Sequence, residues 1–297
     1  MNQLYLLPCL DSAELAAANR KALDIPRHIA AELGNSALTA SGSGRYHNTS
    51  GSEVDFSDLV EAARISKLSI APEDSLPSSK ARSPFPLTQI QVANETTLVA
   101  SRRLVNRNLR PLALNFANGI VPGGGFLNGA RAQEENICRS SALHLTLFGD
   151  SMYVEHAKRP LPDSTAWCIL SPGIPVFRED DGSSLDQPWL LSVITCAAPY
   201  APTVGRTRSA EMLQQRIHRV LAIARAFGFE TLVLGAWGCG AFGNDPKRTA
   251  ADFRHALETE FCGAFSEIVF AITDWSPERK FLGPFRDIFA SSSGKSD

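Results

Sequence analysis

Hydrophobic and polar positions follow one arrangement before about residue 88 and another after it. Beyond residue 88, short apolar runs typical of buried strands alternate with segments whose apolar residues recur every three or four positions. The expected strands are 89–92, 111–116, 166–170, 190–196, 231–234 and 268–272. This alternation predicts an α/β fold of three layers, with helices on both faces of a mixed, largely parallel central sheet.

Helices are expected between these strands. One runs from residue 95 to about 106, and a second follows the 111–116 strand. The second places apolar residues on one face, namely Cys138, Ala142, Leu145 and Phe148. A third carries Leu213 and Ile217 inward and closes at Gly228, and a fourth begins at Asp245-Pro246, with proline at the first helical position.

The first 85 residues lack this regular alternation and indicate a mainly helical N-terminal accessory region packed on the core. Residues 12–33 are expected to form a helix, and the next twenty, rich in Gly, Ser, Thr and Asn, a loop or loose hairpin. Asp55 and Ser57 can cap a further helix, and 71–86 is expected to be a linker. The predicted organisation is therefore 1–85 accessory region, 86–290 α/β domain and 291–297 disordered tail.

Composition narrows the classes of function. The chain has 297 residues, of which 44% are apolar and 20% charged, and a net charge of −2, which argues against broad electrostatic binding of nucleic acid. No apolar run is long enough for a membrane span, and the first residues lack the basic start of a secretion signal, so we expect a cytoplasmic protein. A monomer is a separate expectation, because the sequence does not reveal the oligomeric state. The six cysteines and six histidines show no metal-ligand spacing, so we expect reduced thiols and no bound metal.

Three consecutive glycines, Gly123, Gly124 and Gly125, follow the 111–116 strand. Glycine lacks a Cβ that would shield its N–H group, so a large anion can lie directly against such a segment. In open α/β sheets, ligands bind beyond the carboxyl ends of strands. A turn rarely needs more than one glycine, so the motif favours a phosphate-binding loop over a simple connection.

Seven residues later, Gln133, Glu134 and Glu135 open the next expected helix. Successive helical residues point about 100° apart, so the two carboxylates are not expected to face one target together. Glu135 shares the inward face with Cys138 and is the better candidate for a general acid. The alternative is that both glutamates only complement the helix dipole.

A second glycine-rich loop, residues 238–243, follows the 231–234 strand. It matches the dinucleotide fingerprint G-x-G-x-x-G, but only one clear strand follows it, too few for a nucleotide-binding half. We therefore interpret it as a second phosphate loop rather than as the mark of an NAD-dependent dehydrogenase. Phe242 either stacks on a ribose or base or joins the core, and Cys239, with no adjacent base, is expected to be an ordinary thiol.

Together these motifs resemble the microbial-type poly(ADP-ribose) glycohydrolases, a branch of the macrodomain-fold enzymes. The family signature is GGG, six to eight residues, then QEE, and here the gap is seven. The segments 115–118, 139–141 and 234–244 also resemble the family. The resemblance covers about residues 90–290.

The resemblance implies a macrodomain-like fold and hydrolysis of the ribose–ribose O-glycosidic bonds of poly(ADP-ribose) from chain ends. ADP-ribosylated proteins are the implied substrates and ADP-ribose the product, with no cofactor. It implies that Glu135 acts as general acid and then as base, and that Glu134 and Asn118 hold ribose hydroxyls. The expected substrate-binding residues are Asn118, Gly123, Gly124, Gly125, Gln133, Gly238, Cys239, Gly240, Ala241, Phe242 and Gly243.

Two alternatives lie close to this interpretation. Removal of a single ADP-ribose from a protein or nucleic acid would use the same cleft. A non-catalytic ADP-ribose reader would need the glycine loops but not Glu135, and the presence of both glutamates disfavours it. Arg206 and Arg208 lie in a polar loop from which they could reach a phosphate, although solvated loop arginines are common.

Overall fold

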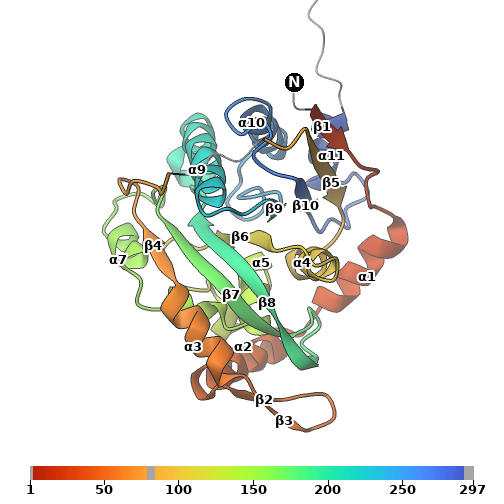
Figure 1. Ribbon diagram of the computed structural model, residues 1–297, viewed down its shortest axis with the longest axis vertical. Coiled ribbons are helices and arrows are strands. Elements are labelled where there is room, and N and C mark those ends of the chain that lie inside the picture. Colours follow the sequence, from red (N-terminus) through yellow and green to blue (C-terminus); the bar gives the residue numbers. More distant parts are fainter. Residues whose placement is uncertain (1–2, 79–83, 291–297) are drawn as a thin grey trace, which may run out of the picture.

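The computed structural model describes residues 3–78 and 84–290 (Figure 1). Its strands are β1 (Gln3–Leu6), β2 (Arg45–His47), β3 (Glu53–Asp55), β4 (Leu68–Ile70), β5 (Leu87–Ala93), β6 (Pro111–Ala117), β7 (Cys168–Arg178), β8 (Ser184–Ala197), β9 (Thr231–Leu234) and β10 (Glu267–Ala271). Its α-helices are α1 (Ala13–Leu23), α2 (Arg27–Ser43), α3 (Ser57–Ser66), α4 (Thr97–Val105), α5 (Gln133–Ser140), α6 (Leu143–Leu147), α7 (Ser151–Ala157), α8 (Ala201–Val204), α9 (Arg206–Ala226), α10 (Pro246–Glu258) and α11 (Leu282–Ala290). A 3₁₀-helix, η1 (Phe126–Asn128), precedes α5.

Eight strands form the central sheet in the order β1-β5-β10-β9-β6-β8-β7-β4. Neighbouring strands from β1 to β8 pair in parallel, whereas β7 is antiparallel to β8 and β4 is antiparallel to β7. Strands β2 and β3 form a separate hairpin. The predicted mixed, largely parallel sheet is confirmed.

Successive residues of the central strands supply two cores on opposite faces of the sheet. In β9, Leu232 and Leu234 belong to the core that includes buried residues of α9, α10 and α11. Val233, between them, belongs to the core that includes α4, α5 and α6. The sheet is therefore the middle of three layers, and the strands are apolar on both faces (Figure 1).

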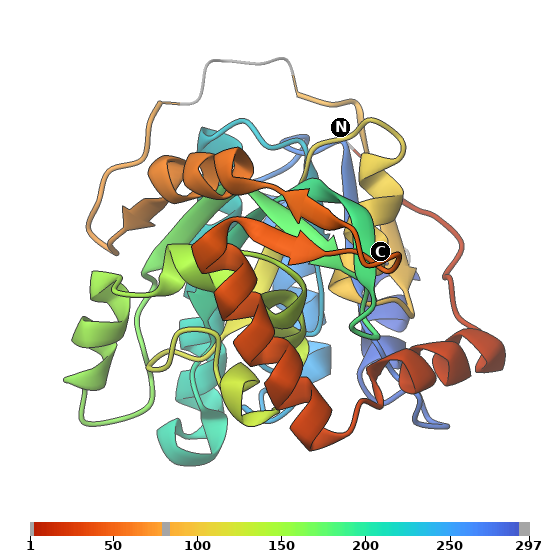
Figure 2. The same cartoon turned by 90° about the horizontal axis from the view of Figure 1, so that it is seen from below.

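Residues before position 85 contribute strands to this same sheet. Strand β1 forms one edge beside β5, and β4 forms the other edge beside β7. In Figure 2 the red and orange segments run across the whole width of the molecule. The domain boundary at residue 85 stays a prediction, and the central sheet extends across it. The predicted tail, 291–297, lies outside the described residues.

The N-terminal helices differ from the expected helix over 12–33. That helix is interrupted between α1 and α2 at Pro26, which has no N–H to continue the first helix and starts the second. The prediction of a loop after residue 33 is wrong for residues 34–43, because α2 continues to Ser43. The helix is closed by Gly44, whose φ is +68°. The poor helix formers in α2 are outweighed by a buried stripe that includes Ala30, Gly34, Ala37 and Ser41.

The helix expected after the glycine loop is split into α5 and α6. Ser141 adopts an extended conformation and pairs with Val176 of β7, which ends α5. Phe148 then falls beyond α6 and is exposed rather than inward-facing. The expectation of one continuous apolar face through Phe148 is therefore wrong, although Cys138 and Ala142 are buried as predicted.

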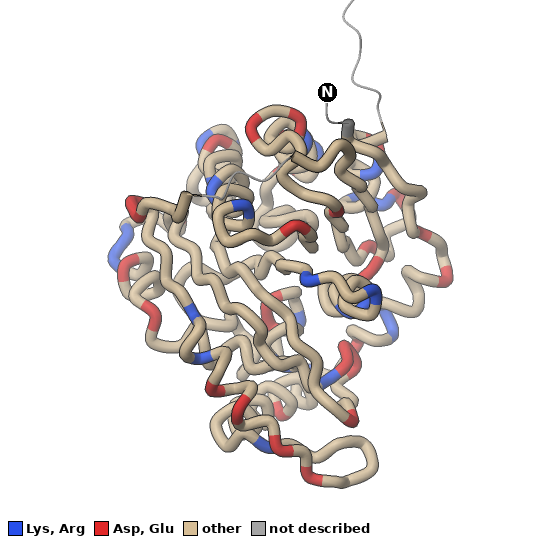
Figure 3. The backbone as a smooth tube through the Cα atoms, in the orientation of Figure 1, with Lys and Arg blue, Asp and Glu red and all other residues tan. Residues whose placement is uncertain are grey.

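Charged residues of both signs are interspersed over the molecule in the view of Figure 3. Among the described residues, no helix has the length and apolar character needed to cross a membrane. Within the same residues, no group of three His, Cys, Asp or Glu side chains is placed to hold a metal ion.

Helix α2 approaches the segment after the glycine loop at Gly34. A Cβ on Gly34 would lie 2.5 Å from the carbonyl oxygen of Phe126 in η1. Arg178 of β7 reinforces this contact by donating from Nη1 to the carbonyl oxygen of Leu33 at 2.8 Å and from Nη2 to Ser36 Oγ at 2.8 Å. Helix α2 is thus held against the loop that precedes α5.

We predict that Gly34→Ala lowers the free energy of unfolding by about 1–3 kcal/mol, because the added methyl group overpacks the contact with Phe126. Gly42→Ala in the same helix is the matched control, since a Cβ there meets nothing within 4 Å. The control should gain a few tenths of a kcal/mol or more from helix propensity. Urea denaturation checks both, and equal stabilities would contradict the role of Gly34.

Candidate active site

A cavity of about 400 Å³ lies beyond the carboxyl ends of the parallel strands. Its wall is built from residues 95–97 after β5, 116–118 at the end of β6, 198 after β8, and 271–273 at the end of β10. Residues 236–238 and 240–242 after β9 and 131–137 around the start of α5 complete most of it. The position is the one expected for ligands in open α/β sheets.

The first three residues of α5 are each tied to a main-chain N–H group. Phe116 N donates to Gln133 Oε1 at 2.9 Å, and Asn118 N donates to Glu134 Oε2 at 2.6 Å. Gly125 N donates to Glu135 Oε1 at 3.0 Å. The motif therefore fixes the helix start against the end of β6 and the glycine loop.

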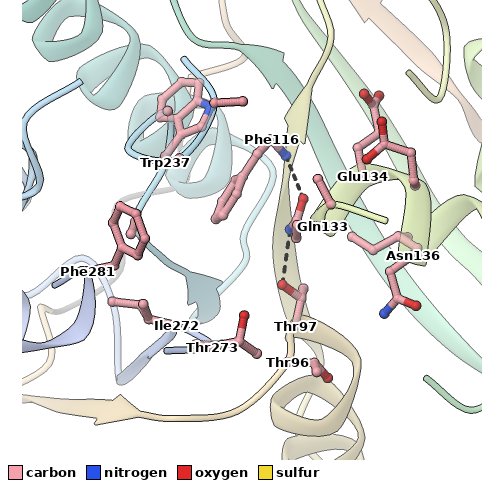
Figure 4. Close-up of a pocket in the computed structure, with 18 of the residues that line it drawn as sticks. Thr96, Thr97, Phe116, Gln133, Glu134, Asn136, Trp237, Ile272, Thr273 and Phe281 are labelled. Atoms are coloured by element: carbon pink, nitrogen blue, oxygen red, sulfur yellow. Dashed lines mark hydrogen bonds between the residues drawn. The ribbon is translucent and has the colours of Figure 1, made fainter. Parts of the chain in front are cut away.

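Gln133 lines the cavity but has both ends of its amide engaged. Its Nε2 donates to Thr97 Oγ1 at 3.0 Å (Figure 4). The same Nε2 donates to the carbonyl oxygen of Leu114 at 2.8 Å. The observed contacts join α5, α4 and β6. Substrate binding by Gln133 stays a prediction.

Glu134 is almost fully buried, with 3% of its surface exposed. Its Oε1 accepts from Asn115 Nδ2 at 3.2 Å. Burial raises the pKa of Glu134 to about 8, and the neighbouring charge of Glu135 adds to the rise, while the hydrogen bond from Asn118 N opposes it. This carboxyl therefore retains its proton far above the usual range.

Glu135 is also buried, but its two oxygens differ. Oε1 accepts from Gly125 N, whereas Oε2 is buried and has no hydrogen-bond partner among the described residues. A buried carboxyl oxygen without a partner is costly in a folded protein unless a ligand supplies one. Because Glu135 lines the cavity, Oε2 is a polar atom whose missing partner a substrate could supply.

The two carboxylates converge on Gly124. A Cβ at this position would lie 2.4 Å from Glu135 Oε1 and 3.1 Å from Glu134 Oε2. The expectation that they would not face one target is wrong. Side chains in the first turn lean toward the helix N-terminus, where the glycine loop lies, so the angular separation of their Cα–Cβ bonds does not keep them apart.

The triple glycine supports the carboxylates directly. Gly123 and Gly124 have φ values of +72° and +59°, which favour glycine. Gly124 N donates to the carbonyl oxygen of Val121 at 2.9 Å, and Gly125 N to Glu135, so neither N–H is free for an anion. None of the three is among the described residues that line the cavity. Contact between these glycines and a diphosphate stays a prediction.

Asn118 lines the cavity at the end of β6. Its Oδ1 accepts from the N–H groups of Ile120 and Val121, both at 2.9 Å. The expected contact with a ribose hydroxyl would therefore have to come from Nδ2.

The second glycine loop is divided between the cavity and the core. Gly238, Gly240, Ala241 and Phe242 line the cavity. Phe242 is half-buried, packs edge-on against Tyr200 and contacts the core. Stacking of its ring on a ribose or base stays a prediction.

Cys239 and Gly243, from the same loop, do not line the cavity among the described residues. Cys239 is buried, and burial raises the pKa of its thiol to about 12. Its structure supports the interpretation as an ordinary thiol. At Gly243 an added Cβ would contact Pro202 at 3.3 Å, outside the cavity.

An apolar end of the cavity was not found from the sequence. Ile272, Trp275 and Phe281 line it together with Phe116. Figure 4 shows Phe281 and Ile272 on the opposite side of Phe116 from Glu134. The end of the 268–272 strand could have indicated Ile272, because carboxyl ends of parallel strands share one sheet edge, but Phe281 follows no such rule.

The cationic residue that lines the cavity is Arg131, rather than the predicted candidates Arg206 and Arg208. Its Nη1 donates to Asp24 Oδ1 at 3.1 Å and to the carbonyl oxygen of Ile25 at 2.8 Å, both in the connection between α1 and α2. Both of those arginines lie in the first turn of α9 rather than in the expected loop. Arg208 is exposed, and its Nη2 lies 3.9 Å from Asp163 Oδ2.

A family profile and the solved structures that resemble this chain both point to the same family. The family profile "Microbial-type PARG, catalytic domain" matches residues 35–179. The structure is similar to poly(ADP-ribose) glycohydrolase from Thermomonospora curvata, with a TM-score of 0.82 and 36% identity over 88% of this chain and 99% of that chain. The comparison with curated proteins gives no match.

Two ligand-bound structures are also similar. The T. curvata enzyme bound to the inhibitor ADP-HPD has a TM-score of 0.80 and 36% identity over 88% of this chain and 99% of that chain. Poly(ADP-ribose) glycohydrolase from Deinococcus radiodurans in complex with ADP-ribose has a TM-score of 0.72 and 37% identity over 80% of this chain and 99% of that chain.

The raised pKa of Glu134 predicts a pH-dependent stability. Between pH 4.5 and about 8 the unfolded chain releases this proton while the folded chain keeps it, so the free energy of unfolding falls as pH rises. Glu134→Gln should remove up to about 1.4 kcal/mol per pH unit of that decline. Asn115 can rotate its amide and offer its unpartnered Oδ1 to the new side chain.

Urea denaturation at pH 5, 6.5 and 8 measures this effect. Glu211→Gln, at an exposed position of α9, serves as the control and should leave the slope of stability against pH unchanged. A Glu134→Gln protein with the wild-type slope would show that Glu134 is ionised in the folded chain at neutral pH.

Proposed function

The chain belongs to the microbial-type poly(ADP-ribose) glycohydrolases, and from this membership we propose that it hydrolyses ribose–ribose O-glycosidic bonds with Glu135 as general acid and base. The activity is that of a glycosidase and releases ADP-ribose. The observation that carries the role of Glu135 is its unpartnered, buried Oε2 in the cavity wall.

The proposed reaction uses one carboxyl twice. Glu135 Oε2 protonates the ribose oxygen that leaves as the C–O bond breaks, and the ring that loses this oxygen becomes oxocarbenium-like. The resulting carboxylate then takes a proton from water, whose oxygen bonds to the anomeric carbon. The hydrogen bond from Gly125 N to Oε1 holds the carboxyl in place through both steps.

The two ends of the cavity suggest how the substrate lies. We place the anomeric bond at the carboxylates and the adenine among Phe116, Ile272 and Phe281, because aromatic and aliphatic side chains favour the flat faces of a base. The diphosphate then lies between them, beside Gly238 and residues 240–242. The ADP-ribose complex of the D. radiodurans relative supports a ligand of this kind.

Glu134 and Asn118 are proposed to hold the ribose next to the scissile bond. In the structure Glu134 Oε2 already accepts from Asn118 N at 2.6 Å, which holds the two residues next to each other. A neutral Glu134 could donate to a ribose hydroxyl, and Asn118 Nδ2 could do the same.

Other features of this proposal come from the sequence. ADP-ribosylated proteins as substrates, a monomeric state, cytoplasmic residence, and the absence of nucleic-acid binding and of a cofactor remain predictions.

Incubation with an automodified poly(ADP-ribosyl)ated protein, followed by separation of products by size, tests the activity. Release of only the protein-linked last unit would instead indicate a mono-ADP-ribosyl hydrolase, and a reader would release nothing.

We predict that Glu135→Gln reduces turnover of poly(ADP-ribose) at least roughly a hundredfold, because the amide cannot exchange a proton at Oε2. Affinity for ADP-ribose should stay within a few-fold, since shape and the contact with Gly125 are preserved. Glu155→Gln, an exposed carboxylate paired with Lys158, should retain full turnover. Unchanged turnover in Glu135→Gln would remove this residue from the mechanism.

Gly124→Ala should reduce turnover by about a hundredfold, because the new Cβ would occupy the place of Glu135 Oε1 and move the carboxyl. Gly173→Ala is a matched control, because Gly173 has a similar φ of +61° but its Cβ would meet nothing within 4 Å. An alanine at either position has the same unfavourable positive φ. Comparing the turnover of the two variants under conditions where both are folded therefore isolates the effect of the Cβ on Glu135. Equal turnover in the two variants would contradict it.

A further inference from the structure

Asp180 is a buried acidic residue that the proposed mechanism does not use. It lies in the turn between β7 and β8 and is 6% exposed. Burial raises the pKa of Asp180, and hydrogen bonds from Thr96 and Asn136, together with the charge of Arg139, oppose the rise. Among the described residues, Asp180 does not line the active-site cavity, whereas Thr96 and Asn136 do. Any effect of Asp180 on a substrate is therefore exerted through these two partners.

The two partners belong to different elements of the cavity wall. Thr96 is the N-cap of α4, and its Oγ1 donates to Asp180 Oδ2 at 2.6 Å. Asn136 directly follows Glu135 in α5 and donates from Nδ2 to Asp180 Oδ1. In Figure 4 the amide of Asn136 lies on the side of Thr96, away from Glu134. One carboxylate thus joins the starts of both helices at the cavity.

Each hydrogen bond in this chain has a defined direction. Arg139 can only donate, and its Nη2 donates to Asn136 Oδ1 at 3.1 Å. The amide of Asn136 is therefore oriented with Nδ2 toward Asp180. Thr96 Oγ1 accepts from Val99 N at 3.0 Å and donates its single proton to Asp180. Asp180 accepts at both oxygens, as an ionised carboxylate does and an amide of the same shape does not.

Arg139 supplies the charge that matches Asp180. Its side chain is buried, and its Nη1 donates to the carbonyl oxygen of Ala130 at 2.8 Å. Burial lowers the pKa of Arg139, and the charges of Glu135 and Asp180 oppose this fall. A buried cation and a buried anion are tolerated when each compensates the other. Arg139, Asn136 and Asp180 therefore form one connected, charge-balanced unit, and Arg139 lies one helical turn after Glu135.

The turn that carries Asp180 is itself fixed on α5. Arg178 Nη1 donates to the carbonyl oxygen of Arg139 at 3.0 Å. Ser140 Oγ donates to the carbonyl oxygen of Glu179 at 3.3 Å. Three consecutive residues of the chain thus contact α5, so the carboxylate of Asp180 is held in a defined place relative to this helix.

We propose that Asp180 is a positioning residue for Glu135. It holds Asn136, the next residue of α5, at a fixed distance from Thr96 at the start of α4. The Glu135 carboxyl is thereby kept where a substrate bound along the cavity wall presents its scissile bond. This inference rests on the proposed function. Loss of the carboxylate should slow turnover more than it weakens binding, because Thr96 keeps its place through Val99 N.

Asp180→Asn keeps the shape of the side chain but turns an amide group toward a hydrogen-bond donor. We expect kcat for poly(ADP-ribose) to fall about tenfold, a part of the hundredfold that a misplacement of about 1 Å can cost. KM and the affinity for ADP-ribose should stay within about threefold. Turnover is expressed per ADP-ribose-binding site, counted by calorimetric titration, so that unfolded protein does not lower the measured kcat.

Asp181→Asn is the matched control, because Asp181 is exposed and accepts from Ser183 N and Oγ within the turn, at 2.9 and 2.6 Å. It should retain the wild-type kcat. Equal kcat in Asp180→Asn and Asp181→Asn would overturn the role of Asp180. A loss of ADP-ribose affinity as large as the loss of kcat would also overturn it, since that result indicates a general structural role.

The double variant Asn136→Asp with Asp180→Asn supplies a rescue. The new carboxylate at position 136 accepts from Arg139, while the new amide at position 180 donates to it and accepts from Thr96. Asn136→Asp alone places two carboxylates against each other and should lower kcat at least as much as Asp180→Asn.

The double variant should recover at least about threefold of the lost kcat. A double variant no faster than Asn136→Asp alone would overturn the proposal, and this comparison decides by itself if Asp180→Asn does not fold. A wild-type chain that leaves poly(ADP-ribose) intact would instead overturn the proposed function.

Discussion

The hydrogen bond from Gly125 N to Glu135 Oε1 joins the glycine bend to the start of α5, and the candidate site depends on it. It can form only because Gly124 has no side chain, since a Cβ would displace the same oxygen. The bend in turn rests on η1 and on α2, which approaches it at Gly34. Gly34, ninety residues before Gly124 in the sequence, thus helps to determine where the Glu135 carboxyl lies.

This arrangement places two adjacent carboxyls in a poorly solvated space. The pKa of Glu134 rises to about 8 because burial disfavours its charge, and three main-chain N–H groups hold the QEE motif despite that cost. Buried, partly unsatisfied polar groups are the local departures from stability that functional sites characteristically show. The same low solvation strengthens any hydrogen bond that a substrate makes to Glu135 Oε2.

The fold class could be predicted because strands such as 231–234 are continuous apolar runs and Asp245-Pro246 starts a helix as its chemistry requires. The GGG and QEE motifs could also be identified, because each is a run of adjacent residues in the sequence. Convergence of Glu134 and Glu135 on Gly124 could not, because it depends on how side chains lean from the first turn toward a distant loop. Phe281 and Arg131 were also missed, since only tertiary packing brings them to the cavity.

The order of strands has a consequence for biosynthesis. β10, the last strand among the described residues, lies between β5 and β9 inside the sheet rather than at an edge. While the chain is still on the ribosome, β1 and β5 therefore have no route to the remaining strands until residue 271 has emerged. Such long-range pairing slows folding, because β5 and β9 cannot be joined through β10 before residues 267–271 are available.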